Sequence, residues 1–137
     1  MPASVETLCV SPERVPEMWP HVERWIERAV RRCGDWTLKA IKDDVFGGEM
    51  LLWILTSDGD LKAAAITQLT IVPRGKVCTV IACGGSAAGS WKSALMPIEN
   101  YANDTECVAM RIRGRIAWAE IFDDYDLEWV ALEKRLN

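Results

Sequence analysis

The sequence predicts one α/β domain over residues 1–137, with a mixed β-sheet and helices on both of its faces. Three observations lead to this prediction. Apolar residues recur at helical spacing from Val22 to Cys33, whereas β-branched and aliphatic runs fill the segment from Met50 to Cys83. Helical spacing returns at Trp91 and gives way to strand-like alternation at Val108. With 137 residues, half of them apolar, the chain can bury one core.

The predicted order of elements begins with a short β-prone run, Val5 to Val10. Ser11-Pro12 then suits a helix start, because serine can cap free backbone N–H groups and proline is tolerated in a first turn. Gly34 is expected to end this helix, since glycine readily adopts the left-handed conformation that follows many helices. A second helix should run from Asp35 or Thr37 to the Gly47-Gly48 pair.

Three consecutive antiparallel strands are predicted next. Asp58-Gly59 favours a tight hairpin turn between the first two strands, and the segment beginning at Pro73 makes a second turn. The predicted strands span Met50 to Thr56, Leu61 to Val72 and Val77 to Cys83.

The second half of the predicted order contains a helix from Trp91 to Ala102. Pro97 falls inside it, and we expect a kink there, because proline lacks the N–H that a helix interior requires. Residues 108–113 alternate between apolar and other side chains and should form a strand parallel to the one before the helix. A short helix carrying Trp118 and Phe122 follows Gly114, and Trp129 to Leu136 alternates as a closing strand. The full predicted order is β-α-α-β-β-β-α-β-α-β.

Composition and charge argue against several functions. The longest apolar stretches are strand-sized, so no membrane span is expected, and the N-terminus lacks the pattern of a signal peptide. The five cysteines contain no C-x-x-C pair and are expected as free thiols in a reducing cytosol, without a metal site. A formal charge of −4 argues against direct binding of nucleic acid. The single histidine, His21, is expected on the outer side of a helix, and Trp19 could be exposed and mark a contact surface.

Several segments together carry a resemblance to a known family. They are VPEMWPHVERWIERA, GGEMLLWILTSDG, VCTVIACGG, the W…IENYA helix and RIRGRIAWAEIF. With the predicted order of elements, they resemble the GNAT (GCN5-related) N-acetyltransferase fold over nearly the whole chain. More narrowly, they resemble short GNAT-like proteins encoded by tailed bacteriophages and prophages. The resemblance implies a GNAT-like mixed sheet and a host-cell or virion setting.

The resemblance also implies a binding site for acetyl-CoA. In the family, backbone N–H groups after the last strand of the meander hold the pyrophosphate at a helix start, where the helix dipole favours an anion. The matching residues here are Gly84, Gly85, Ser86, Ala87, Gly89 and Ser90. Their small side chains would let the backbone approach a ligand, although glycine is also common in simple connecting turns. Arg111, Arg113 and Arg115 could place guanidinium groups near this loop, or lie on an exposed strand face.

The sequence departs from the family pattern at two points. Neither Gln nor Arg stands where the phosphate-binding signature begins before Gly84. The tyrosine that often serves as general acid is replaced by Phe122, and Tyr125 could take that role or be structural. The strand from Val77 to Cys83 holds no carboxylate, so the base would be Glu49 or a water relay, although a carboxylate at the start of a strand is more often simply solvated.

Two hypotheses remain open from the sequence. The first is an acyl-CoA-dependent N-acyltransferase that modifies an amine on a small molecule or a protein. The second is a non-catalytic GNAT-like module, acting as a phage structural component or binding a protein partner. A gap between strands Val77 to Cys83 and Cys107 to Arg113 that is open would favour the enzyme, whereas a gap filled by Trp91 or Trp118 would favour the module.

Overall fold

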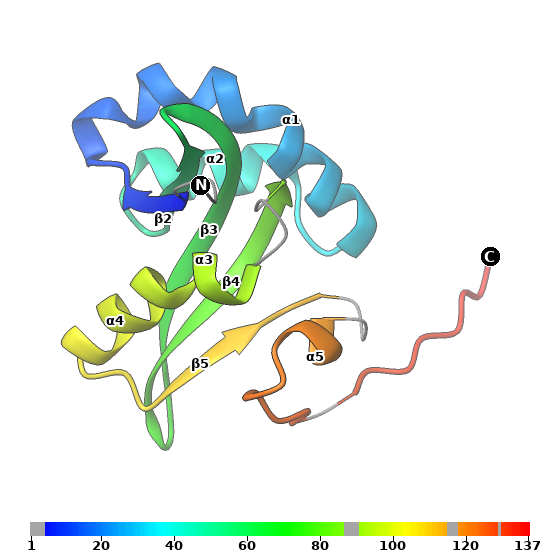
Figure 1. Cartoon of the computed structure of the whole chain (residues 1–137). Helices are drawn as coiled ribbons and strands as arrows, with labels where there is room; N and C mark the ends of the chain where they lie inside the picture. The colour runs from blue at the N-terminus through cyan, green and yellow to red at the C-terminus, as the bar shows by residue number, and fades with distance from the viewer. Residues whose placement is uncertain (1–4, 87–90, 115–117, 129) are drawn as a thin grey trace.

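The computed structural model describes residues 5–86, 91–114, 118–128 and 130–137. Within these residues the sheet has five strands in the order β1-β2-β3-β4-β5 (Figure 1). Neighbouring strands are antiparallel from β1 to β4, and β5 lies parallel to β4, which confirms the predicted mixed sheet. The strands are β1 (Val5–Cys9), β2 (Leu51–Ser57), β3 (Asp60–Val72), β4 (Gly75–Gly85) and β5 (Ala109–Ile112).

Two helices follow β1, as predicted. After a 3₁₀ turn (Pro12–Arg14), α1 (Val15–Cys33) ends at Gly34, whose φ of 76° is the left-handed conformation that glycine adopts easily. The second helix, α2 (Leu38–Phe46), begins at Thr37, whose hydroxyl accepts a hydrogen bond from the Ala40 N–H. Thr37 rather than Asp35 is therefore the helix cap.

The predicted meander of three antiparallel strands is confirmed to within two residues at each end. Asp58 and Gly59 have φ values of 53° and 86°, and positive φ at both central residues matches the right-handed twist of the paired strands. In the β3–β4 ladder, Ile66 pairs with Ala82 and Thr67 pairs with Val80. The intervening residue of β4, Ile81, therefore forms a β-bulge.

The helix with the internal proline is interrupted, as Pro97 predicted, and it restarts instead of merely kinking. The two parts are α3 (Trp91–Ala94) and α4 (Met96–Asp104). Pro97 lies in the first turn of α4, where its missing N–H removes no helical hydrogen bond. A last short helix, α5 (Trp118–Ile121), follows β5.

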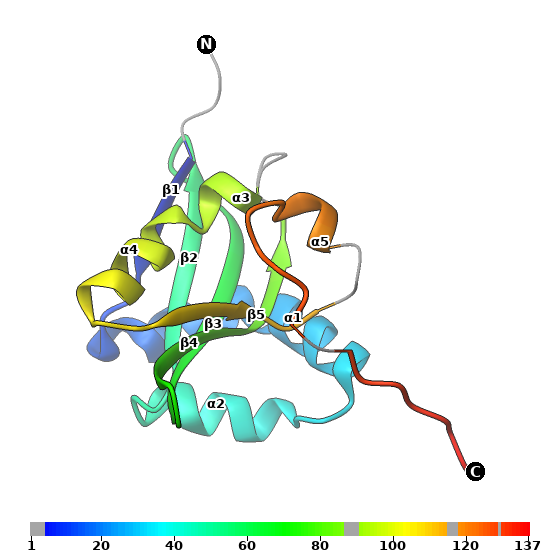
Figure 2. The same cartoon turned by 90° about the horizontal axis from the view of Figure 1, so that it is seen from below.

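Helices cover both faces of the sheet, as predicted (Figure 2). α1 and α2 lie on one face, where Val22 and Ile26 of α1 pack in one cluster with Leu52 and Ile54 of β2. α3, α4 and α5 lie on the other face, where a second cluster includes Trp53 of β2. Leu52 and Trp53 belong to different clusters because successive strand residues point to opposite faces.

The predicted closing strand from Trp129 to Leu136 is wrong for the part that the structure describes. Residues 130–137 carry no strand or helix, and Leu132 and Leu136 are 95% and 85% exposed. Alternation gave the segment a strand-like pattern, but a strand also needs a neighbour for its backbone groups. Figures 1 and 2 both show this segment running away from the rest of the molecule.

Candidate functional site

The parallel strands β4 and β5 stay paired for only part of their length. The register joins Val77 to Ala109 and ends with Val80 opposite Ile112, followed by a 3.3 Å hydrogen bond from the Arg113 N–H to the Val80 carbonyl. β4 continues to Gly85 on the side of β3. Among the described residues, no strand pairs with the β5 side of β4 beyond Val80, so a backbone edge is left open there. The bulge at Ile81 lies at this separation.

A row of aromatic side chains lies beside the strand separation. Trp91 meets Trp118 edge-on with 5.9 Å between ring centroids, and Trp118 stacks on Phe122 at 5.7 Å. These three rings belong to the cluster that also contains Cys83 of β4 and Ile112 of β5. The aromatic row therefore belongs to the cluster that covers this face of β4 and β5.

Two of the glycines assigned to a cofactor loop lie at the end of β4. Gly84 and Gly85 are strand residues that pair with Ala64 and Ala63 of β3, and the Ser86 N–H donates to the Lys62 carbonyl at 2.9 Å. The connection between β4 and α3 therefore starts after Gly85, later than predicted.

Close packing explains both glycines without a ligand. A Cβ at Gly84 would lie 2.9 Å from the Trp25 carbonyl oxygen. Gly85 has a φ of 97°, and a Cβ there would lie 2.4 Å from the Lys62 oxygen. Four other predicted cofactor residues, Ala87, Gly89, Ser90 and Arg115, lie outside the described residues.

Tyr125 forms a polar pair that the sequence did not predict. Its hydroxyl donates a hydrogen bond of 2.6 Å to Oε2 of Glu99, on α4. The Tyr125 ring also contacts Phe122 edge-on at 5.4 Å, which connects the pair to the aromatic row. Glu99 is the residue that sequence reasoning missed. The position of Glu99 in the first turn of a helix that begins with proline was only a weak signal of a functional role. Its partner, Tyr125, lies 26 residues away, so no local pattern connects the two.

A cavity of about 300 Å³ lies beside this pair. Four carboxylate side chains and two arginines line it, so its formal charge is −2 and it favours a cationic ligand. Arg111 contributes a buried Nε atom that has no hydrogen-bond partner among the described residues. The charged lining residues are Arg74, Glu99, Arg111, Asp124, Asp126 and Glu128.

Electrostatics favour the protonated form of Tyr125. Burial and the hydrogen bond to Glu99 raise its pKa, because the neutral phenol suits both the low-dielectric surroundings and the carboxylate acceptor. Proton transfer from this phenol to a thiolate, whose own acid has a pKa of about 8.5, would be uphill. Tyr125 is therefore a poor proton donor to a leaving group, and Oε2 of Glu99 is the proton acceptor within its reach.

The other predicted site residues lie apart from this pair or at the surface. Glu49 is exposed at the α2–β2 connection, where its N–H donates to the Asp44 carbonyl at 2.8 Å, and no described contact joins it to Tyr125. Arg113 is exposed at the end of β5. Burial raises the pKa of Cys83 to about 11, which makes this thiol a weak nucleophile.

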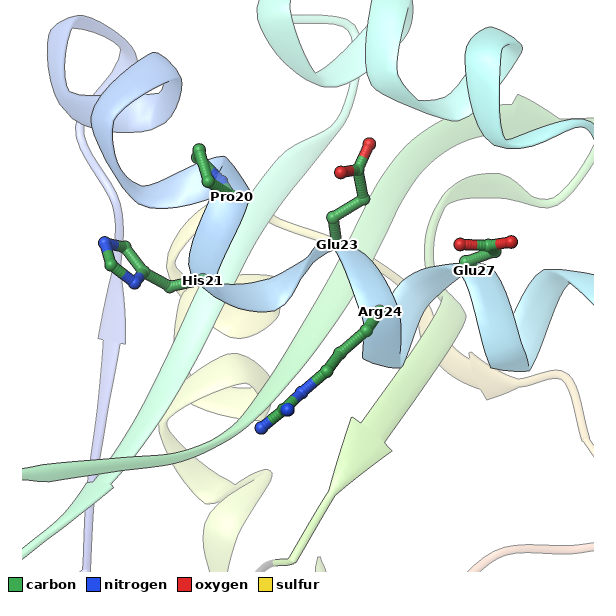
Figure 3. Close-up of a pocket in the computed structure, with 5 residues that line it drawn as sticks. All are labelled: Pro20, His21, Glu23, Arg24 and Glu27. Carbon is green, nitrogen blue, oxygen red and sulfur yellow. The ribbon is translucent and has the colours of Figure 1, made fainter.

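A second hollow, of about 390 Å³, lies on the outer surface of α1. Figure 3 shows that all its lining residues come from this one helix and that His21, Glu23 and Arg24 point in different directions. His21 is exposed, as predicted. Trp19, in contrast, is only 2% exposed and packs against Phe46, so the predicted contact surface at this tryptophan is wrong. The hollow lacks convergent groups and is not a candidate site.

The described residues also bear on membranes and metals. No helix among them is long and apolar enough to cross a membrane. They contain no cluster of three or more His, Cys, Asp or Glu side chains that could hold a metal ion.

Comparison with known proteins identifies the fold. No protein-family model matches the chain, and no curated protein is similar to it in sequence. Among solved structures, the chain resembles a ribosomal-protein-alanine N-acetyltransferase from Brucella melitensis, with a TM-score of 0.64 and 13% identity over 98% of this chain and 100% of that one.

Two further structures give the same result. A predicted acetyltransferase with acetyl-CoA from Clostridium acetobutylicum has a TM-score of 0.61 and 9% identity over 95% and 96% of the two chains. A GNAT family acetyltransferase from Staphylococcus aureus has a TM-score of 0.60 and 10% identity over 97% and 99%. The chain has the GNAT acetyltransferase fold, as the sequence resemblance implied.

Proposed function

We propose that this protein is an acyl-CoA-dependent N-acyltransferase that acts on a cationic amine. The observation that carries the proposal is the separation of β4 from β5 beyond Val80 and Ile112. A cavity with a formal charge of −2 lies at the other end of β5, along residues 109–111. The ring contact between Tyr125, which lines this cavity, and Phe122 links the cavity to the aromatic row beside the separation. The GNAT fold of the chain supports the same reaction class by analogy.

The open edge of β4 fits the acyl donor. The pantetheine arm of CoA is an extended chain with amide groups, and such a chain can hydrogen-bond to a free strand edge as an added strand does. Residues 81–85 of β4 would hold it, with Trp118 packed against it from α5. When bound, the donor supplies a thioester carbonyl that an amine can attack.

The Tyr125–Glu99 pair would handle the proton in this reaction. The ammonium of the acceptor would enter the acidic cavity and pass a proton to the Tyr125 oxygen, while the Tyr125 hydroxyl proton moves to Glu99. The freed nitrogen lone pair forms the C–N bond, the C–S bond breaks, and the second proton that the nitrogen then loses passes through water to the leaving thiolate. Glu99 thus replaces Glu49 as the proposed base, and Tyr125 becomes a relay instead of a general acid.

Donor binding tests the first half of the proposal. Acetyl-CoA and free CoA would be titrated calorimetrically into the protein, into Trp118→Ala and into Trp36→Ala, a control tryptophan that packs on the opposite face of the sheet. We expect micromolar binding that Trp118→Ala weakens about tenfold by removing aromatic contact, and that Trp36→Ala leaves unchanged.

Turnover tests the second half. With acetyl-CoA and spermidine as the amine probe, Glu99→Gln should lower kcat by about 10² or more while the Kd of CoA stays unchanged. Glu49→Gln, at an exposed position outside the cavity, should retain full activity. Equal loss in both variants would reject Glu99 as the base.

A second candidate function is a non-catalytic GNAT-fold module that binds a protein partner, such as a phage structural protein. The contact between Trp91 and Trp118 favours it, because packed rings beside the strand separation leave less space for a donor. Absence of CoA binding at millimolar concentration would favour this candidate. Binding that appears only in Trp118→Ala would favour it as well, since the indole would then block a former donor site.

A further inference from the structure

The cavity beside the Tyr125–Glu99 pair holds charges of both signs that are not paired with one another. Arg74, in the turn between β3 and β4, and Arg111, on β5, line it together with four carboxylate side chains. In the described part of the chain, neither arginine lies within 4.0 Å of a carboxylate oxygen, and the ion pairs are found elsewhere. The two guanidinium groups are therefore not neutralised by contact with the carboxylates of their own cavity.

Arg111 gives the stronger indication that the cavity binds an anionic group. Its Nε atom is buried and has no hydrogen-bond partner among the described residues. A charged donor that is removed from water without a partner costs free energy, and a ligand that supplies the partner recovers this cost. A guanidinium group presents its N–H donors in a planar fork that matches the two oxygens of a carboxylate. A carboxylate on the ligand would therefore satisfy Arg111, with Arg74 as a second positive charge on the same cavity.

The acidic side chains of the cavity favour ammonium groups on the same ligand. They are Glu99, Asp124, Asp126 and Glu128, and they outnumber the two arginines. A ligand with more ammonium groups than carboxylates therefore complements the net charge of the cavity. Small-molecule sites typically enclose about 300–1,000 Å³, and the cavity of about 300 Å³ lies at the lower end of this range. An amino acid with a cationic side chain combines both charges in a small molecule.

We propose that the cavity binds a free diamino acid, such as lysine or ornithine, whose carboxylate is held by Arg111 and Arg74 and whose ammonium groups face the acidic side chains. That this ligand is also the acetyl acceptor rests on the proposed function, because the ligand would present an ammonium group to the Tyr125–Glu99 pair. The two arginines then determine specificity. They select an amine that carries a carboxylate over a diamine or polyamine that lacks one, so spermidine would be a poorer acceptor than lysine.

Two ligands that differ by one group test this inference. Cadaverine has the carbon chain and both amines of lysine but no carboxylate, so it carries two positive charges near neutral pH where lysine carries a net charge of one. If net charge alone governed binding, the acidic cavity would bind cadaverine more tightly. Both ligands would be titrated calorimetrically into the protein, into Arg111→Met and into Arg28→Met, a control at an exposed position of α1 on the opposite face of the sheet. Arg74→Gln changes an exposed turn residue and should weaken lysine binding as well, so the test does not depend on Arg111→Met alone.

We expect lysine to bind with a Kd at least about tenfold below that of cadaverine. Arg111→Met should weaken lysine binding about tenfold or more and tighten cadaverine binding, because it removes both the carboxylate partner and a positive charge from the cavity. Arg28→Met should change neither. Cadaverine that binds the unmodified protein as tightly as lysine would overturn the inference. So would an equal loss of both ligands in Arg111→Met, which would mean that the arginine only shapes the cavity, or an absence of lysine binding at millimolar concentration.

Acetyl transfer separates this inference from the proposed function. With acetyl-CoA as the donor, lysine should give a higher kcat/KM than cadaverine, and Arg111→Met should reverse that preference. Lysine binding without acetyl transfer to any of these amines would reject the proposed function and leave the carboxylate-binding site in place. Acetyl transfer to spermidine and cadaverine without a preference for lysine would do the reverse.

Discussion

The two faces of the sheet are built differently. The face under α1 and α2 is packed with aliphatic side chains, and the 19-residue α1 covers much of it. The opposite face carries helices of four, nine and four residues, an aromatic row and a polar cavity. The packing of the first face thus mainly stabilises the fold. The second face is packed less continuously and contains a hollow where a ligand could bind.

Truncation of the aliphatic face should produce the largest effect. Ile26 is fully buried between α1 and the sheet, so Ile26→Ala should lower the free energy of unfolding by about 2–5 kcal/mol through lost contacts and a residual cavity. Denaturant unfolding measures this change, with Ile26→Val as the control at about 1 kcal/mol. A loss of CoA binding in a folded Ile26→Ala protein would contradict the division between the faces.

The polar pair on the other face should matter less for stability and depend on pH. Tyr125→Phe removes one hydrogen bond and should cost about 1 kcal/mol near neutral pH. The raised pKa of Tyr125 means that its stabilising effect is complete below the ordinary tyrosine pKa of about 10 and is lost as the pH rises further.

Unfolding of both proteins between pH 8 and about 11 should therefore show the difference shrinking above about pH 10. A stability difference that stays constant across this range would mean that the Tyr125 proton is not held by Glu99.

The smallest expected effect has the opposite sign. The buried Nε of Arg111 has no hydrogen-bond partner in the described part of the chain, so Arg111→Met should raise the free energy of unfolding by about 1 kcal/mol or leave it unchanged. Thermal unfolding without acetyl-CoA measures the change in stability, and thermal unfolding with acetyl-CoA measures whether the variant still gains stability from the ligand. A clear loss of stability in Arg111→Met would show that the arginine supports the fold and is not reserved for a ligand.

Local signals in the sequence were sufficient for most of the fold. Gly34, Thr37, Asp58-Gly59 and Pro97 each act through the backbone conformation or hydrogen bond of their own neighbourhood, and each marks the boundary that the structure has. The parallel pairing of β5 also followed, because a strand joined to the preceding one through a helix must run in the same direction.

Only the tertiary structure decided the candidate site and the end of the chain. Glu99 meets Tyr125 across 26 residues, and the close approach of the Lys62 carbonyl limits residue 85 to glycine. The alternation in residues 130–136 gave one property of a strand. Whether such a segment pairs depends on which sheet edge is free and on what lies beside that edge. Sequence thus determined the elements and their order as far as the last short helix, whereas contacts between distant elements, which no local pattern encodes, determined what those elements bring together.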